Sequence, residues 1–270
     1  IKMSFQQIKY SEAVFDDFLR YNYFFNFKNE NINMEDIFKK HFNFSFEEYA
    51  KFVNLVFLLS SKTQVLSKEI ILNNIPTLDK LKIQSMLKHL TQTRDEFIES
   101  FNKNNKIGTE DYDQFQKLYD FNPLLIKPFI SYEEELYLPI PQLMYWAITE
   151  GFYHKICDEE GKKFTEDFGK NVFEKYIEKI IKTNEKIKIF PEFKYNKNND
   201  LSPDFILVKG DEMIFLEAKA AKTIIQMRNL HLDCYKQEIK KAFGKAVKQC
   251  VKKEQLYLNG KMKESKDKSI

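Results

Sequence analysis

Apolar residues recur with the period of an α-helix through most of the first 120 residues. The pattern covers residues 11–19, 34–38, 46–59, 77–90 and 93–101. Such spacing predicts helices with one buried face, and residues 1–120 are expected to form a helical N-terminal domain. Ser45 precedes Glu48 by three residues, the spacing of a helix-capping box. The abundant Phe and Tyr side chains are expected in the core of this domain, with a platform that stacks on bases as the alternative.

Prolines interrupt the helical pattern after residue 120. Two apolar runs, Leu124–Ile130 and Leu136–Ile140, flank the acidic stretch Glu133-Glu134-Glu135. These runs are predicted to pair as a small hairpin around an exposed turn. The following residues, Gln142–Asp158, return to helical spacing. Residues 121–160 are therefore expected to form a hairpin and a connecting helix.

Two long amphipathic helices are predicted in residues 161–270. The first covers Phe164–Thr183, with Thr165 as its N-cap. The second covers Leu232–Leu258; its polar face is rich in lysine, and Gly260 is expected to end it.

Three strands are predicted between these helices. Lys186–Tyr195 alternates apolar and polar residues, and its Pro191 favours an edge strand. The runs Phe205–Val208 and Met213–Leu216 flank the turn Gly210-Asp211, which is typical of a β-hairpin. Because both runs are continuously apolar, both strands are expected to be covered on each face. The predicted fold class is α/β (α+β), a mixed sheet flanked by helices and preceded by the helical domain.

Charged residues stand where the two hairpin strands begin and end. Asp204 precedes the first strand, and Glu217, Ala218 and Lys219 follow the second. Side chains alternate along a strand, so Glu217 and Lys219 are expected on one face. Buried charges are costly unless they are paired or bind a metal ion, which makes these residues candidates for a site. An exposed cross-strand ion pair is the alternative.

The net charge of +3 is unevenly distributed along the 270 residues. Residues 1–150 contain 17 basic and 21 acidic side chains, whereas residues 151–270 contain 26 and 19. This asymmetry favours a polyanionic partner for the second half, with solvated lysines as the alternative.

The three cysteines form no closely spaced pair, which favours a reducing, cytoplasmic setting. No apolar run is long enough to span a membrane, and the first residue is Ile, which suggests a trimmed N-terminus.

Carboxylates at these positions are suited to bind a hard divalent cation. Mg²⁺ or Mn²⁺ is typically held by one or two carboxylates together with water and phosphate oxygens. Asp204 and Glu217 supply two carboxylates, and the backbone carbonyl of Ala218 offers a third oxygen. Glu174 on the preceding helix is a further candidate, directly or through water, unless it is an ordinary surface residue. Lys219 is expected to assist the attacking water or to stabilise negative charge.

The segment Pro203-Asp204, twelve intervening residues and Glu217-Ala218-Lys219 resembles the signature of the PD-(D/E)XK nuclease superfamily. The sequence FGKNVFEKY around Glu174 is similar to the helix that carries a further acid in that family, and Gln249 resembles an accessory polar residue near its metal. The resemblance covers about residues 160–260 and implies a restriction-endonuclease-like core. Such a core ends with one more strand, so the C-terminus is expected to be truncated.

The resemblance implies a metal-dependent nuclease, with Asp204, Glu217, Lys219 and Glu174 as catalytic residues. DNA is the expected substrate, and the implied activity is a DNA endonuclease of bacterial restriction or anti-phage defence. The N-terminal domain would then bind substrate, a protein partner or a second copy of the chain. Two alternatives remain: a nuclease-like subunit that binds nucleic acid without cleaving it, and a helical interaction protein in which the motif arose by chance.

Overall fold

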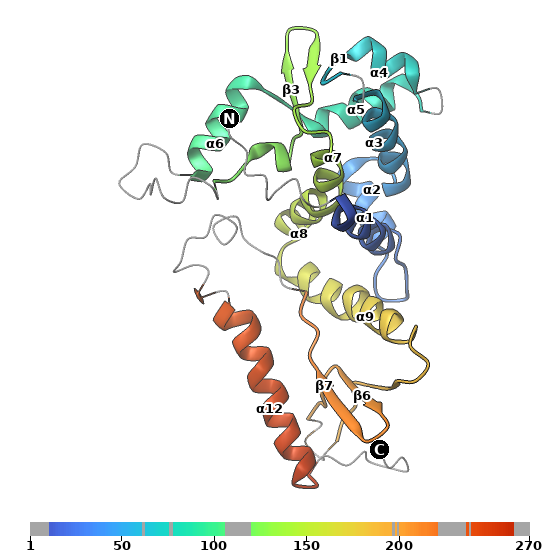
Figure 1. The fold of residues 1–270 in the computed structure, drawn as a ribbon, viewed down its shortest axis with the longest axis vertical. Helices are drawn as coiled ribbons and strands as arrows, with labels where there is room; N and C mark the ends of the chain where they lie inside the picture. Colours follow the sequence, from blue (N-terminus) through green and yellow to red (C-terminus); the bar gives the residue numbers. More distant parts are fainter. Residues whose placement is uncertain are drawn as a thin grey trace. The chain divides into compact units, whose positions relative to one another are not determined.

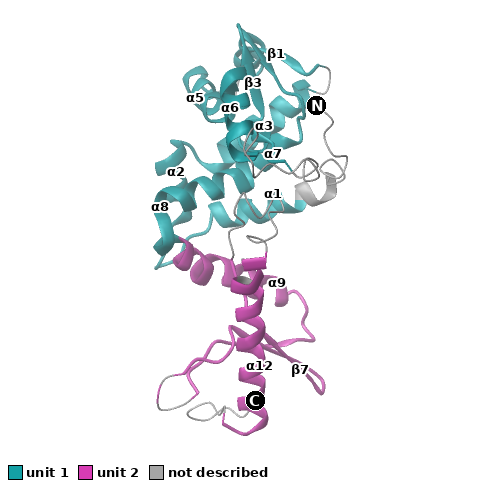
Figure 2. Cartoon of the chain, turned by 90° about the vertical axis from the view of Figure 1, so that its left-hand side faces the viewer, with its two compact units in different colours: residues 1–164, 224–230 teal, residues 165–223, 231–270 magenta. Residues whose placement is uncertain are grey.

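A computed structural model describes residues 11–60, 63–75, 78–105, 120–195, 198, 200–220, 236, 237 and 239–261. The chain divides into two compact units, which Figure 2 shows in different colours. Among the described residues, those up to Phe164 belong to unit 1 and those from Thr165 onward belong to unit 2. The protein is thus a mixed α/β chain with a separate sheet in each unit.

Helices make up most of unit 1 (Figure 1). The π-helical turn η4 (Ala147–Gly151) joins the last two of them. In the described ranges, no helix is long and apolar enough to cross a membrane. The helices are α1 (Ser11–Phe25), α2 (Met34–Phe42), α3 (Phe46–Ser60), α4 (Lys68–Asn74), α5 (Lys80–Leu90), α6 (Arg94–Asn105), α7 (Leu143–Trp146) and α8 (Phe152–Phe168).

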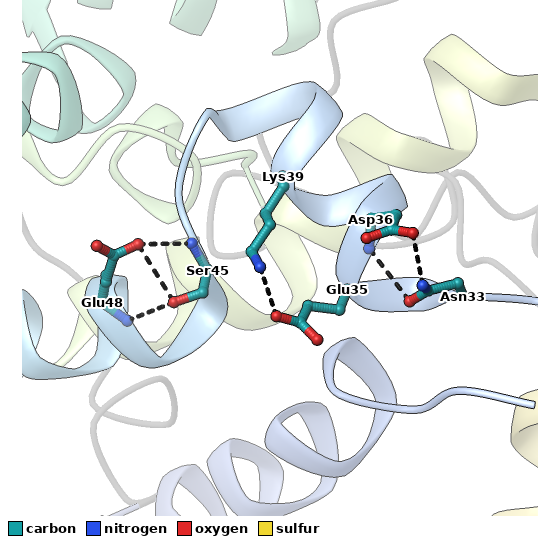
Figure 3. Close-up of polar contacts among 6 residues, drawn as sticks. All are labelled: Asn33, Glu35, Asp36, Lys39, Ser45 and Glu48. Carbon is teal, nitrogen blue, oxygen red and sulfur yellow. Dashed lines mark hydrogen bonds and ion pairs between the residues drawn. The ribbon is translucent and has the colours of Figure 1, made fainter.

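Side-chain caps define where α2 and α3 begin (Figure 3). The predicted capping box is confirmed, because the Ser45 N–H donates to Glu48 Oε2 at 2.9 Å and the Glu48 N–H donates to Ser45 Oγ at 3.2 Å. Asn33 caps α2 by accepting from the Asp36 N–H. The left-handed residue Asn43, with φ of 62°, ends α2, so the chain turns sharply between the two helices.

Aromatic side chains form the core of unit 1, as their abundance predicted. Phe38, Phe42 and Tyr49 are fully buried. Phe42 stacks on Phe152 with ring centroids 4.0 Å apart and packs against Phe38 at 4.7 Å. Because these rings are sealed inside the helical unit, they hold the helices together and cannot stack on bases.

The predicted acidic hairpin is confirmed as β3 (Phe129–Tyr132) paired with β4 (Glu135–Tyr137). Two further strands, β1 (Val65–Ser67) and β2 (Thr91–Thr93), extend it to a mixed sheet of order β1-β4-β3-β2, in which β2 runs parallel to β3. The first arm is shorter than predicted. Residues 123–125 form a 3₁₀ turn led by Pro123, since proline supports a helical turn at its first position.

Unit 2 has the predicted order of helix, three strands and helix. Its sheet is antiparallel with the order β5-β6-β7, so Pro191 lies on an edge strand as expected. The elements are η5 (Gly169–Phe173), α9 (Glu174–Ile181), β5 (Lys188–Pro191), β6 (Phe205–Lys209), β7 (Glu212–Leu216), η6 (Lys240–Gly244) and α12 (Lys245–Leu258).

Helix α12 lies against β7 and closes the core of unit 2 (Figure 1). Ile206 on the central strand is fully buried, and Phe215 and Tyr257 pack around it. The helix ends before Gly260, whose φ of 64° is the left-handed conformation predicted there.

Two details of the sequence prediction for unit 2 are wrong. Strand β7 is not covered on both faces, because Ile214 is 56% exposed. A short apolar run does not distinguish a doubly covered strand from an edge strand with one covered face.

Thr165 is not an N-cap, because helix α8 continues through it. The helical pattern is instead broken at Gly161, where φ is 77°, a conformation that glycine adopts without strain.

A matched pair of isoleucines tests the packing of the sheet. Ile206→Ala is expected to lower the free energy of unfolding by about 2–5 kcal/mol, since it leaves a cavity at the centre of the core. Ile214→Ala, on the exposed face of β7, is expected to change it by less than about 0.5 kcal/mol. Urea unfolding followed by circular dichroism measures both values, and equal effects would contradict the assigned faces of the sheet.

Candidate functional site

The register of the β6–β7 hairpin brings Asp204 and Glu217 together. Phe205 and Leu216 face each other at the open end of the hairpin. Asp204 immediately precedes this pair on one strand and Glu217 immediately follows it on the other. The antiparallel pairing therefore places the two carboxylates next to each other, as the motif predicted.

Hydrogen bonds and ion pairs join these residues into an acid–lysine cluster, defined as Asp204, Glu217, Ala218 and Lys219. The Ala218 backbone N–H donates to Asp204 Oδ2 at 2.7 Å. Lys219 Nζ lies 2.8 Å from Glu217 Oε2 and 3.6 Å from Asp204 Oδ2. One ammonium group thus contacts carboxylates from both ends of the hairpin. The carbonyl of Ala218 makes no hydrogen bond with the described residues.

Burial distinguishes this cluster from an ordinary surface ion pair. The side chains of Glu217 and Asp204 are only 5% and 11% exposed, whereas that of Lys219 is 39% exposed. Burial disfavours the charge of Lys219, but the hydrogen bond with Glu217 and the attraction of both carboxylates outweigh it, so the pKa of Lys219 is raised. Lys219 therefore remains a cation at neutral pH, suited to neutralise negative charge rather than to accept a proton.

Glu174, the first residue of α9, adds a third carboxylate to the environment of the cluster. Burial and then repulsion by Asp204 and Glu192 raise the pKa of Glu174 to about 7, while Lys170 and Lys219 oppose the shift. The turn before α9 also runs beside the end of the hairpin, because a methyl group on Gly169 would lie 3.7 Å from the Ala220 methyl. Glu174 is therefore a partly buried acid whose pKa depends on the charges of the cluster.

Helix α12 contacts this region through Cys250. Cys250 Sγ donates to the Phe215 carbonyl at 3.7 Å, and burial together with the charge of Glu217 raises the pKa of Cys250. The neighbouring Gln249 has a buried Oε1 without a hydrogen-bond partner in the described part of the chain. An unpaired buried oxygen is costly, so Gln249 retains a free acceptor for a ligand.

Sequence reasoning missed that Cys250 lies near the cluster and that Glu192 lies near Glu174. Cys250 directly follows Gln249 and lies on the apolar stripe of the last helix. That position was the sequence signal from which its packing against the sheet could have been predicted. Glu192 follows Pro191 at the end of β5 and lies 3.7 Å from Lys170. Its influence on Glu174 depends on how α9 meets the sheet, a tertiary arrangement that no local pattern reveals.

The donor set fits a hydrated hard cation rather than a fully protein-bound one. Among the residues that the structure describes, no group of three or more His, Cys, Asp or Glu side chains is arranged to hold a metal ion. Asp204 and Glu217, however, converge on one positive group, and Mg²⁺ or Mn²⁺ requires only one or two carboxylates when water completes its octahedron. Glu174 would act on such an ion through water, and Gln249 would be an accessory.

The raised pKa of Glu174 predicts a pH-dependent stability in EDTA. Its folded pKa of about 7 exceeds the ordinary 4.5, so the stabilisation is complete below pH 4.5 and is lost as the pH rises through 7. Because Glu174 is only partly buried and water screens its interactions, raising the pH from 5 to 8 is expected to destabilise the wild type by on the order of 1 kcal/mol more than Glu174→Gln. Urea unfolding at both pH values tests this, with Glu185→Gln as the exposed control; parallel curves for all three proteins would contradict it.

Replacing Lys219 tests the charge balance of the cluster. Lys219→Met leaves Asp204 and Glu217 without their cation and is expected to cost about 1–3 kcal/mol, less than a fully buried pair because Lys219 is partly exposed. Millimolar Mg²⁺ is expected to raise the melting temperature of this variant more than that of the wild type, since the ion takes the place of the ammonium group. Lys209→Met, at the exposed turn, is the control. An unchanged response to Mg²⁺ in differential scanning fluorimetry would contradict the expectation.

Comparisons with known proteins found no match to this chain. No protein-family model matches the chain. No curated protein and no solved structure is significantly similar to it. The acid–lysine cluster and the helices around it are therefore the basis on which a function is assigned.

Proposed function

We propose that unit 2 is a Mg²⁺- or Mn²⁺-dependent nuclease that hydrolyses phosphodiester bonds, with DNA as its substrate. The observation that carries this proposal is the contact of Lys219 with both Asp204 and Glu217. Two buried acids and a lysine at the open end of one hairpin are the groups that phosphodiester hydrolysis requires. They bind a cation, polarise the phosphate and neutralise the charge that develops on it.

The surroundings of the cluster support a core of the PD-(D/E)XK type. The acids of that signature stand before one strand and after the next, and Asp204 and Glu217 have this placement around β6 and β7. A helix precedes the three strands and contributes Glu174, and a second helix follows and contributes Gln249. This order agrees with the restriction-endonuclease-like architecture that the sequence resembles.

Each residue has a distinct role in the proposed reaction. Asp204 and Glu217 hold the cation, which supplies a Lewis acid and activates water. Lys219, which stays protonated, stabilises the negative charge that builds on the phosphate oxygens. Glu174, with a pKa of about 7, is able to hold or release a proton at neutral pH and orients water at the edge of the cluster.

Cleavage of plasmid and linear DNA tests the proposal. Cutting is expected with Mg²⁺ or Mn²⁺ and is expected to stop in EDTA. Asp204→Asn, Glu217→Gln and Lys219→Met are each expected to lower the cleavage rate at least about 100-fold, because each removes charge needed in the transition state. Glu212→Gln, an exposed acid at the start of β7, is the control and should keep the wild-type rate. Circular dichroism verifies that each variant is folded.

The outcomes separate the proposal from its alternative. Metal-independent cutting, or full activity in a folded Asp204→Asn variant, would contradict the assigned roles. DNA binding without cleavage under every metal condition would instead favour a catalytically inactive, nucleic-acid-binding subunit.

A further inference from the structure

A groove lined by lysines runs along the C-terminal helix of unit 2. It has a volume of about 600 Å³ and is formed by one face of η6 and α12. Its lining residues are Lys240, Lys241, Gly244, Lys245, Lys248, Gln249 and Lys252. Five lysine side chains thus lie along one face of this helical segment.

Most of these lysines have no acidic partner among the residues that the structure describes. In the described part of the chain, no carboxylate lies within ion-pairing distance of Lys240, Lys245, Lys248 or Lys252. Other helical lysines differ: Lys182, for example, lies 2.6 Å from Glu178. Residues 236–261 contain eight lysines and two glutamates. The positive charge of the groove is therefore not neutralised within its own helix.

The length of the groove matches several phosphate groups. Lys240 and Lys252 are twelve residues apart, which corresponds to about 18 Å along a helix. Phosphates on one strand of B-form DNA advance by about 3.4 Å along the axis while the strand winds around it, so a straight row of this length reaches several of them at most. The row of lysines is thus long enough to contact more than one phosphate.

The groove and the sheet lie on opposite faces of α12. Cys250 contacts the Phe215 carbonyl on β7, whereas Lys248 and Lys252, which line the groove, are each two residues from Cys250 in the sequence. Two residues correspond to about 200° around an α-helix. A nucleic acid in the groove would therefore contact the face of α12 that is turned away from β7.

We propose that this lysine groove binds the sugar–phosphate backbone of a nucleic acid independently of its base sequence. The inference rests on the proposed function, since the partner it names is the nucleic acid that the proposed nuclease would bind. The contacts are electrostatic, so binding does not require the divalent cation. An acidic protein and an anionic membrane also carry negative charge, but a straight row of lysines matches the linear chain of phosphates of a nucleic acid better than it matches a flat membrane or an irregular protein surface.

Binding in EDTA tests the proposal apart from cleavage. The full chain is titrated into fluorescein-labelled 20-nucleotide DNA, single-stranded or duplex, and anisotropy is followed from 50 to 300 mM KCl. The variant Lys245→Gln, Lys248→Gln, Lys252→Gln is compared with a control of equal charge change, Lys186→Gln, Lys188→Gln, Lys209→Gln. The groove variant is expected to bind at least about 10-fold more weakly at 100 mM KCl, with the slope of log K against log salt reduced by about 2 to 3. The control is expected to change affinity less than about 2-fold.

Each outcome has a defined meaning. Loss confined to the groove variant supports the proposal, and the single-strand and duplex probes show which form is preferred. Equal losses in both variants would show that only total charge matters and would overturn it, as would unchanged binding. Loss of binding to polyglutamate or to anionic vesicles, with DNA binding retained, would also overturn it. If the groove variant loses DNA binding while the wild type never cleaves, the groove stands and the nuclease proposal fails.

Discussion

The structure of unit 2 is organised around the balance of charge at the open end of one β-hairpin. Asp204 and Glu217 are nearly buried, and two negative groups so close together would destabilise the fold without a cation. The Lys219 ammonium and the Ala218 N–H provide that compensation. Because the same carboxylates are the proposed metal ligands, the interaction that stabilises the unit also preorganises its site. Glu174 shows the limit of this compensation, since it is driven toward its protonated form.

Features encoded by neighbouring residues could be predicted from the sequence. The capping box of Ser45 and Glu48, the β6–β7 hairpin and the left-handed residue Gly260 each depend on a few consecutive side chains. Strand β7 ends at Leu216, but the Lys219 ammonium still contacts the Glu217 carboxylate, as expected for side chains two residues apart on one side of the chain. The core of the candidate site was predictable for this reason, because its residues flank a single hairpin and its register is local.

Features that depend on distant segments could not be predicted. Strands β1 and β2 have three residues each and no distinctive period, and they exist because β4 and β3 offer them edges. The influence of Glu192 on Glu174 and the approach of Cys250 to β7 arise only when helix and sheet have packed. The exposure of Ile214 reflects the number of layers around β7, which an apolar run does not reveal.

The position of β7 has a consequence for how the protein behaves at high concentration. Among the described strands, β7 lies at the edge of its sheet, so one row of its backbone N–H and C=O groups has no strand partner there. Such an edge is a template for adding a strand from another molecule. The exposed Ile214 offers an apolar side chain for such a contact. Asp211 and Glu212 at the turn, both exposed, act as gatekeepers, because their charges repel a second identical edge. The strand that leads to Glu217, a proposed metal ligand, is thus also an edge that favours self-association of unit 2.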